Sequence, residues 1–202
     1  VDVNYSLVVH PSLPVKSVAE LVAYAKAQPE KLSHPSSGNG TLSHLLMEDF
    51  KRRAGIRLLH VPYPGSAKAM TDLVGGQVQV GLDTLSVTLP LVEAGRLRML
   101  AIGTTSRLDA LPAIPTLSEL GYTGFEAVAW VALTAPAGTP LAWRERLNDA
   151  VRAALRNPQF LQKMRAANAY PRSGTVDEFA SMLRTEYVRW GRIVRQSGVQ
   201  VD

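Results

Sequence analysis

Short apolar runs alternate with longer amphipathic stretches along the first half of the chain. The runs have the length of strands, and the stretches between them repeat their apolar positions with the spacing of a helix. From residue 6 to about residue 103 this alternation is typical of parallel βαβ units, whose helices cover a parallel or mixed sheet. The predicted strands are residues 6–9, 32–34, 56–61, 78–82, 97–102 and 126–133.

Capping boxes mark where several helices begin. In this motif a Ser or Thr hydroxyl accepts a hydrogen bond from the amide three residues later, and the Glu at that position accepts one in return. The pattern occurs at residues 17–20, 116–119 and 175–178, and we expect a helix to start at each. Thr139 followed by Pro140 predicts a further helix that reaches about residue 156.

The C-terminal part of the chain is rich in predicted helix and poor in predicted strand. Residues 140–202 contain about three helices, and Leu147, Val151 and Leu155 form one apolar stripe among them. Apolar helix faces need a surface to cover. They pack either on the preceding α/β segment or on a sheet whose other strands come from elsewhere.

Composition and charge narrow the classes of function. Hydrophobic residues make up 46% and charged residues 19% of the chain, which is ordinary for a globular protein, and no apolar run approaches the roughly 20 residues that cross a bilayer. The net charge of +5 comes from residues 141–202, where 11 Lys and Arg stand against 6 Asp and Glu. Because those arginines are spread around a helix and mixed with acidic residues, we expect no nucleic-acid partner.

Metal and cofactor chemistry finds little support in the sequence. Cysteine is absent, which excludes disulfides and thiolate metal sites. The histidines, at positions 10, 34, 44 and 60, lack the spacing of a metal-binding motif, although His34 and His60 end predicted strands and could be neighbours. We expect neither a metal site nor a cofactor.

The segment between the second predicted strand and the helix after it is the candidate ligand site. Its two glycines permit a close approach of the backbone to a ligand, and the helix start offers unpaired amides with partial positive charge. An ordinary strand-to-helix turn capped by Thr41 would explain the same residues. Neither a dinucleotide fingerprint nor a P-loop is present. The candidate ligand-binding residues here are Ser36, Ser37, Gly38, Asn39, Gly40 and Thr41.

Two further strand ends carry polar residues. Tyr63 and Ser66 follow the strand at 56–61, and Asp83 follows the strand at 78–82. In open α/β sheets, ligands bind outside the carboxyl ends of the strands. Asp83 either receives an ammonium or hydroxyl group of a ligand or caps the next helix, and the sequence leaves both interpretations open.

The sequence argues against an enzyme. Ser36 or Ser37, together with His44 and Asp83, supplies the residue types of a hydrolytic triad. A triad depends on geometry, however, and the Gly-x-Ser-x-Gly nucleophile elbow is absent. We expect no catalytic residues.

Six segments, in a fixed order, carry a family resemblance. They include Ser-Ser-Gly-Asn-Gly-Thr at 36–41 and His-Val-Pro-Tyr-Pro-Gly-Ser at 60–66, with the others at 7–17, 72–80, 111–116 and 135–140. With them the chain resembles the Bug family of periplasmic receptors, the TctC-like solute-binding proteins of tripartite tricarboxylate transporters. The six segments extend over essentially the whole chain.

This resemblance implies an α/β fold of the type II periplasmic-binding-protein class. Two lobes would close on a small carboxylate, such as an amino acid, a di- or tricarboxylate or an aromatic acid, and deliver it to membrane transporter subunits. The signal peptide would have been removed on export to the periplasm. A loop from each lobe would hold the carboxylate, partly through ordered waters. Residues 36–41 would be one of these loops, with Asp83 on the same wall.

One departure from the family is large. Family members carry an N-terminal segment before the position of Val1, with a loop that supplies the other half of the clamp. We therefore expect a complete α/β lobe at residues 8–126 and a partial second lobe of hinge strands and helices at 127–202 together with 1–7. We interpret the chain as a shortened product, which would bind weakly and would self-associate through its exposed partial lobe.

Three other functions remain open from the sequence. The chain could be the effector-sensing domain of a transcription regulator, because such domains share the bilobed architecture. It could be a small hydrolase, which turnover of esters would reveal. It could also be a family member that has lost its ligand and keeps only a protein partner.

Overall fold

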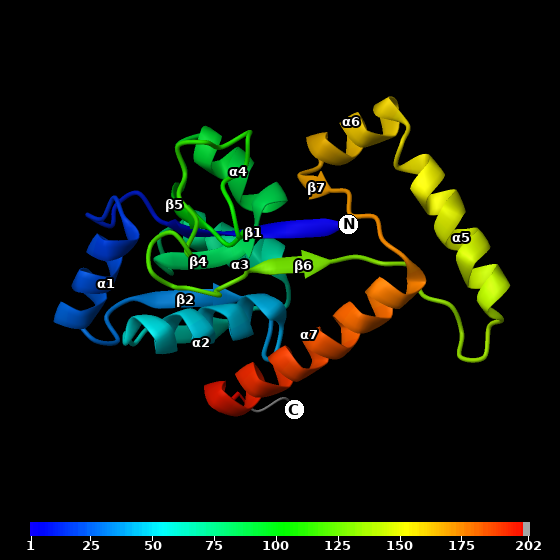
Figure 1. The fold of residues 1–202 in the computed structure, drawn as a ribbon. Coiled ribbons are helices and arrows are strands. Elements are labelled where there is room, and N and C mark those ends of the chain that lie inside the picture. Colours follow the sequence, from blue (N-terminus) through cyan, green and yellow to red (C-terminus); the bar gives the residue numbers. More distant parts are fainter. Residues whose placement is uncertain (200–202) are drawn as a thin grey trace. The chain divides into compact units, whose positions relative to one another are not determined.

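The computed structural model describes residues 1–199, which divide into two compact units (Figure 1). The larger unit contains Asn4–Val128 and the described residues from Ile193 onward. The smaller unit contains Val1–Val3 and Ala129–Arg192. No helix in the described part of the chain is both long enough and apolar enough to cross a bilayer.

The strands of the larger unit belong to two hydrogen-bonded sheets. In one, β1 (Asp2–Val9) lies between β4 (Val80–Thr84) and β5 (Arg98–Ile102), and in the other β2 (Ser33–Ser36) pairs with β3 (Leu59–Pro62). Strand β1 is antiparallel to both β4 and β5, whereas β2 and β3 are parallel to each other and β2 lies beside β4. The α/β class is confirmed, but the direction of β1 differs from the expected parallel units. Apolar periodicity identifies a strand without specifying its direction.

Four helices connect these strands. They are α1 (Val18–Ala27), α2 (Leu42–Ala54), α3 (Ser66–Val74) and α4 (Leu85–Glu93). The capping box predicted for α1 forms with one partner changed: the Glu20 amide donates to Ser17 Oγ at 3.2 Å, but the Glu20 carboxylate accepts from the amide of Lys16, at 2.7 Å, and not from that of Ser17. Helix α2 ends at Gly55, whose φ of 63° closes the last turn in the left-handed region.

The helix predicted to start at residues 116–119 does not form. Thr116 and Glu119 make both hydrogen bonds of a capping box, at 2.9 and 3.0 Å, yet the chain forms only turns here. Gly121, with a φ of 97°, turns the backbone away from a helical path after about one turn. The strand predicted at 126–133 is also shorter than expected, since β6 covers only Val128–Trp130.

Side chains from the sheet, α3 and α4 form a hydrophobic cluster in the larger unit. Helix α3 approaches β4 closely because β4 has Gly81 at the contact, where a Cβ atom would lie 2.6 Å from Leu73 Cδ2. The close approach therefore depends on the missing side chain. The buried members of the cluster are Val8, Ala69, Met70, Leu73, Val78, Leu85, Leu97, Met99 and Ile102.

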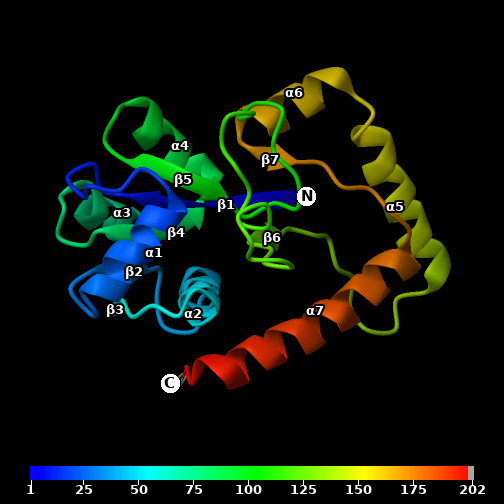
Figure 2. The same cartoon turned by 60° about the vertical axis from the view of Figure 1, so that its left-hand side comes forward.

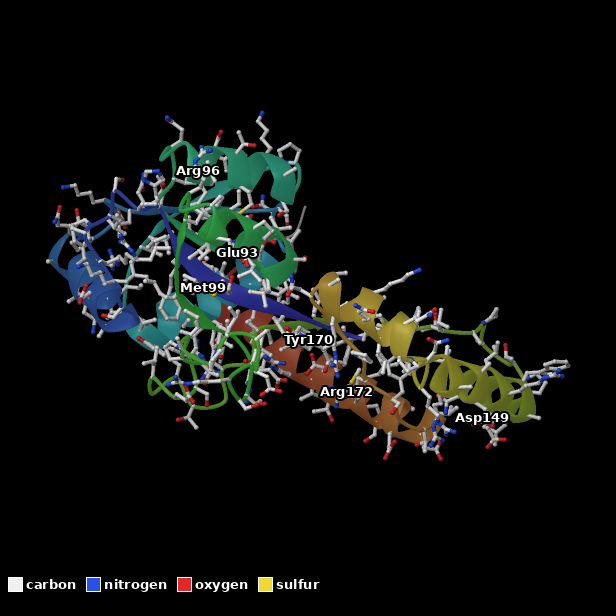
Figure 3. All side chains as sticks on the ribbon, turned by 90° about the horizontal axis from the view of Figure 1, so that it is seen from above. Glu93, Arg96, Met99, Asp149, Tyr170 and Arg172 are labelled. Atoms are coloured by element: carbon white, nitrogen blue, oxygen red, sulfur yellow. The ribbon has the colours of Figure 1, made fainter. Side chains whose placement is uncertain are left out.

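The smaller unit is mainly helical. Its elements are the first residues of β1, most of β6, β7 (Ala169–Tyr170), α5 (Leu141–Ala154), α6 (Pro158–Ala166) and most of α7 (Val176–Ser197). Asp2 of β1 pairs with Tyr170 of β7, and Nη1 of Arg172 lies 3.8 Å from the Asp2 carboxylate (Figure 3). The capping box predicted for α7 forms between Thr175 and Glu178, at 2.7 and 3.1 Å.

Large apolar side chains of the smaller unit are exposed. Neither α5 nor α6, drawn in yellow and gold in Figure 2, contains a buried residue. In the apolar stripe that the sequence predicts here, Leu147 is exposed, whereas Val151 and Leu155 are half-buried. The exposed large apolar residues of this unit are Trp130, Val131, Leu133, Leu141, Trp143, Leu147, Phe160, Leu183, Tyr187 and Val188.

Candidate functional site

Residues 36–41 connect β2 to α2 in the larger unit, as the sequence predicts. Ser36 is the last residue of β2, and its carbonyl oxygen accepts from the amide of Tyr63, just after β3, at 3.0 Å. Ser66, at the start of α3, donates to the Asp83 carboxylate at 2.5 Å. Contacts therefore run from the end of β2 to the end of β3, and from the start of α3 to the end of β4, so the three polar strand ends are neighbours.

Hydrogen bonds within the loop hold residues 36–41 in a compact turn. The hydroxyls of Ser36 and Thr41 both donate to the carbonyl oxygen of Gly38, at 3.1 and 2.7 Å. The hydroxyl of Ser43 accepts from the amide of Ser37 at 3.1 Å. Gly38 and Gly40 have φ angles of 133° and 70°, which side chains rarely adopt, so both positions require glycine.

Thr41 occupies the N-cap position of α2 without capping it through its side chain. Thr41 is thus the N-cap residue that the sequence predicts, but its hydroxyl donates to Gly38 and leaves the amides of the helix uncapped. Among the described residues no group accepts a hydrogen bond from the amides of Leu42, Ser43 or His44. The first turn of α2 thus keeps three donors, next to the positive end of the helix dipole.

Asp83 is 5% exposed and already accepts two hydrogen bonds. One carboxylate oxygen accepts from the Ser66 hydroxyl and the other from the amide of Thr84, the N-cap residue of α4, at 2.6 Å. Asp83 therefore fastens the starts of α3 and α4. Burial and the charge of Asp83 together raise the pKa of the neighbouring Tyr5 to about 12.

The imidazole rings of three histidines stack on one another next to residues 36–41. We call this group the histidine stack (His34, His44 and His60). The ring centroids of His44 and His60 lie 3.7 Å apart, and those of His34 and His60 lie 5.0 Å apart. The sequence suggested that His34 and His60 are neighbours, and the parallel register of β2 and β3 places them opposite each other. The sequence does not predict that His44, on the first turn of α2, stacks on His60.

The histidine stack is bonded to both ends of the loop. His60 Nε2 lies 2.7 Å from the hydroxyl of Ser36, and the amide of Gly40 donates to His44 Nδ1 at 3.2 Å. The hydroxyl of Ser36 also lies 3.1 Å from the carbonyl oxygen of Gly38, and we infer that it donates there and accepts from His60 Nε2. His44 must keep Nδ1 unprotonated in order to accept from Gly40.

Burial keeps the rings of the histidine stack neutral at pH 7. It lowers the pKa of His34 and of His44, and it lowers the pKa of His60 to about 4. Two protonated rings about 4 Å apart would repel by about 4 kcal/mol at an effective dielectric constant of 20. Both ring nitrogens of His34 are buried, and no described residue forms a hydrogen bond with either, although Nε2 lies 3.5 Å from Oε1 of Glu48.

Glu48 is the carboxylate that faces the histidine stack. Its Oε1 lies 3.7 Å from His44 Nε2 and 2.6 Å from Nζ of Lys51. Burial acts to raise the pKa of Glu48, but His34 and Lys51 outweigh it and hold that pKa at about 2. The carboxylate is therefore ionised across the physiological range.

The residues of the hypothetical hydrolytic triad are not assembled. His44 accepts from Gly40 and Asp83 from Ser66 and Thr84, so neither contacts a candidate nucleophile. Ser36 does contact His60, but it is 1% exposed and out of reach of a substrate. Among the described residues, no set of three or more His, Asp or Glu side chains is arranged to hold a metal ion.

Comparison with known proteins gives a consistent result. A sequence model of the family described as "Tripartite tricarboxylate transporter family receptor" matches residues 1–199. The chain is 34% identical to Protein BugT of Bordetella pertussis over 200 residues, which are 99% of the chain and 61% of BugT. It thus spans about three fifths of the length of that relative.

Solved structures show the same similarity. Rpa4515 of R. palustris, solved with adipate, is 36% identical with a TM-score of 0.88, over 98% of this chain and 66% of that protein. MatC from Rhodopseudomonas palustris, solved with bound malate, is 26% identical with a TM-score of 0.81, over 96% of this chain and 67% of that one. The periplasmic binding protein BugD is 29% identical with a TM-score of 0.84, over 98% and 67%. These similarities confirm the periplasmic-binding-protein fold.

Proposed function

The chain belongs to the tripartite tricarboxylate transporter receptor family, and from this premise we propose that it is part of a periplasmic receptor for a small carboxylate. Such a receptor is not an enzyme, needs no cofactor and passes its ligand to membrane transporter subunits. The adipate of Rpa4515 and the malate of MatC support a carboxylate as the ligand class.

The unpaired amides at the start of α2 carry this proposal. Leu42, Ser43 and His44 have free backbone donors directly after a loop whose two glycines expose further backbone. A carboxylate there would replace water as the acceptor for these donors and would be favoured by the helix dipole. We assign contact with the carboxylate to residues 37–41 and to the first turn of α2, whereas Ser36, which is 1% exposed, supports the loop through its bonds to Gly38.

Asp83 has a supporting part in the proposed site. Its carboxylate fixes Ser66 and Thr84, and thereby the starts of two helices next to residues 36–41. The oxygens that accept these bonds retain lone pairs for an ammonium or hydroxyl group of the ligand. Such a contact would distinguish amino and hydroxy acids from plain dicarboxylates.

We expect this chain alone to bind its ligand weakly. It spans 61% of the length of BugT, and tight binding of a small ligand requires that most of the ligand surface is buried. At a ligand concentration equal to Kd the stabilisation is about 0.4 kcal/mol, which raises Tm by only about 1–2 °C. Thermal shift with glutamate, aspartate, citrate or nicotinate should therefore be marginal.

An NMR titration of the ¹⁵N-labelled chain tests the proposal at such weak affinity. We expect malate or adipate to shift the amide resonances of residues 37–44 in fast exchange with a millimolar Kd. The neutral diamide adipamide, which has the shape of adipate without its charge, should shift them little. Absence of shifts at this loop, or equal shifts with adipamide, would rule out the proposal.

A matched pair of charge variants sharpens the test. Asn39 is exposed, and Asn39→Asp places a negative charge in the loop with almost no change of shape. One unit charge at about 4 Å in water costs about 1 kcal/mol, so the affinity should fall about fivefold. Gln162→Glu makes the same change on the exposed side of α6 and should leave the affinity unchanged.

A further inference from the structure

We propose that the neutral histidine stack positions residues 36–41 for carboxylate binding, and that its protonation releases the loop and weakens binding. His44 and His60 are positioning residues in this account, because they act through Gly40 and Ser36. The predicted effect on carboxylate binding rests on the proposed function. The positioning of the loop by the histidine stack can be tested without a ligand.

The two attachments of the loop differ in their response to a proton. His60 donates from Nε2 to Ser36 and can take up a second proton at Nδ1 without losing that bond. His44 accepts from the amide of Gly40 at Nδ1, the only ring atom at which a neutral His44 of this tautomer can be protonated. A proton on His44 therefore turns the hydrogen bond to Gly40 into a contact between two donors.

The rings of the histidine stack influence one another's protonation. His44 and His60 are stacked at 3.7 Å with planes 13° apart, so a charge on one ring disfavours a charge on the other. The other charged groups facing the stack are Glu48 and Lys51 of α2, which are paired with each other at 2.6 Å. Glu48 Oε1 is 3.7 Å from His44 Nε2, so it offers a protonated His44 an alternative partner on the side away from the loop.

The predicted pH dependence of carboxylate binding is opposite to the one that charge attraction alone would give. An added positive charge near an anion site would normally strengthen carboxylate binding as the pH falls. Here protonation acts on the geometry of the loop, because the amide of Gly40 loses its acceptor and the turn that presents the α2 amides loses one of its two attachments to the histidine stack. Burial lowers the pKa of all three rings, so this transition lies below pH 6.5.

The ligand-free chain tests the positioning role directly. We expect a scalar coupling across the hydrogen bond between the Gly40 amide nitrogen and His44 Nδ1 at pH 7.5, and we expect it to disappear below pH 6.5 as His44 is protonated and the Gly40 resonance moves. His44→Asn places a side-chain oxygen near the position of Nδ1 and does not titrate. The Gly40 resonance of this variant should not change over the same range, and His10→Asn should behave like the unmodified chain.

Ligand titrations at each pH give the second readout. At the pH where two thirds of the Gly40 transition is complete, the unmodified chain should have lost about threefold more malate affinity than His44→Asn, because only a third of its loops remain competent. Titration of malate itself is common to both proteins and cancels in this comparison. Coincident pH profiles, or a Gly40 coupling that persists at every pH at which the larger unit stays folded, would overturn the inference.

The ligand-free measurement and the ligand titrations distinguish failure of this inference from failure of the proposed function. If the loop titrates as described but no carboxylate shifts it at any pH, the positioning role stands and the receptor assignment fails. If carboxylates bind but the Gly40 resonance does not change with pH, the receptor assignment stands and the positioning role fails. Should His44→Asn not fold, the coupling and the resonance of Gly40 in the unmodified chain still decide the positioning role.

Discussion

Glu48 and His60 make the stability of the larger unit depend on pH. Glu48 has its pKa held at about 2 instead of its ordinary 4.5, and burial lowers the pKa of His60 from 6.5 to about 4. For both groups the folded chain binds protons less readily than the unfolded chain, so stability decreases as the pH falls. The contribution of His60 is complete above pH 6.5 and is lost towards pH 4, and that of Glu48 is lost between pH 4.5 and 2.

Replacing His60 by a residue that does not titrate should make the stability of the larger unit less dependent on pH. His60→Gln keeps a side-chain donor for Ser36 but has no proton to gain, so its Tm should change less between pH 7 and 4. We expect the Tm of the unmodified chain to fall by about 5 °C more than that of the variant, given about 2–4 °C per kcal/mol for a chain of this size. Thermal melts followed by circular dichroism measure the difference. Parallel Tm curves for the two proteins would show that His60 is not the responsible group.

The elements that the sequence predicts best are those specified by local signals. Capping boxes form at Ser17 and Thr175, and helices follow both. The box at Thr116 has the same hydrogen bonds but no helix, because Gly121 ends the segment. The loop at 36–41 was likewise found from its own residues. The histidine stack could not be, because it depends on the register between β2 and β3, which is set by tertiary packing.

The close packing of α3 on β4 depends on one missing side chain. Gly81→Ala would bring a Cβ atom 2.6 Å from Leu73, which is itself fully buried. Overpacking of this kind costs about 1–3 kcal/mol in the free energy of unfolding, which urea denaturation measures. Gly75→Ala, at the right-handed C-cap of the same helix, should cost less than about 1 kcal/mol.

A double variant tests the stated cause of this cost. Leu73→Ala removes the atom that Gly81→Ala would strike, so the two changes together should cost less than the sum of their separate effects. Strict additivity of the two free energies would show that the close approach to Leu73 is not the source of the destabilisation.

At the scale of the whole molecule, the two units differ in how well their apolar residues are covered. The larger unit buries a continuous cluster, whereas α5 and α6 of the smaller unit bury nothing. Exposed apolar area of this kind favours contact with another surface. We therefore expect the chain to self-associate in solution.

Sedimentation velocity at increasing concentration checks this expectation. The sedimentation coefficient should rise with concentration for the unmodified chain. The double change Leu147→Lys with Tyr187→Lys, at side chains 56% and 84% exposed, should reduce the rise. Leu120→Lys, on the larger unit and 43% exposed, serves as the control and should not. A coefficient independent of concentration in the unmodified chain would contradict the expectation.

The Asn39–Gly40 dipeptide has a consequence for how long a preparation stays usable. Asn39 is exposed, and the next residue is a glycine. Because Gly40 has no side chain, nothing hinders its backbone nitrogen from attacking the side-chain amide of Asn39. That attack expels ammonia and leaves a cyclic imide, which water opens to aspartate or isoaspartate. Ageing of the protein thus installs, without mutagenesis, a negative charge in the turn proposed to receive an anion. Fresh and stored samples should be treated as different proteins in any ligand measurement.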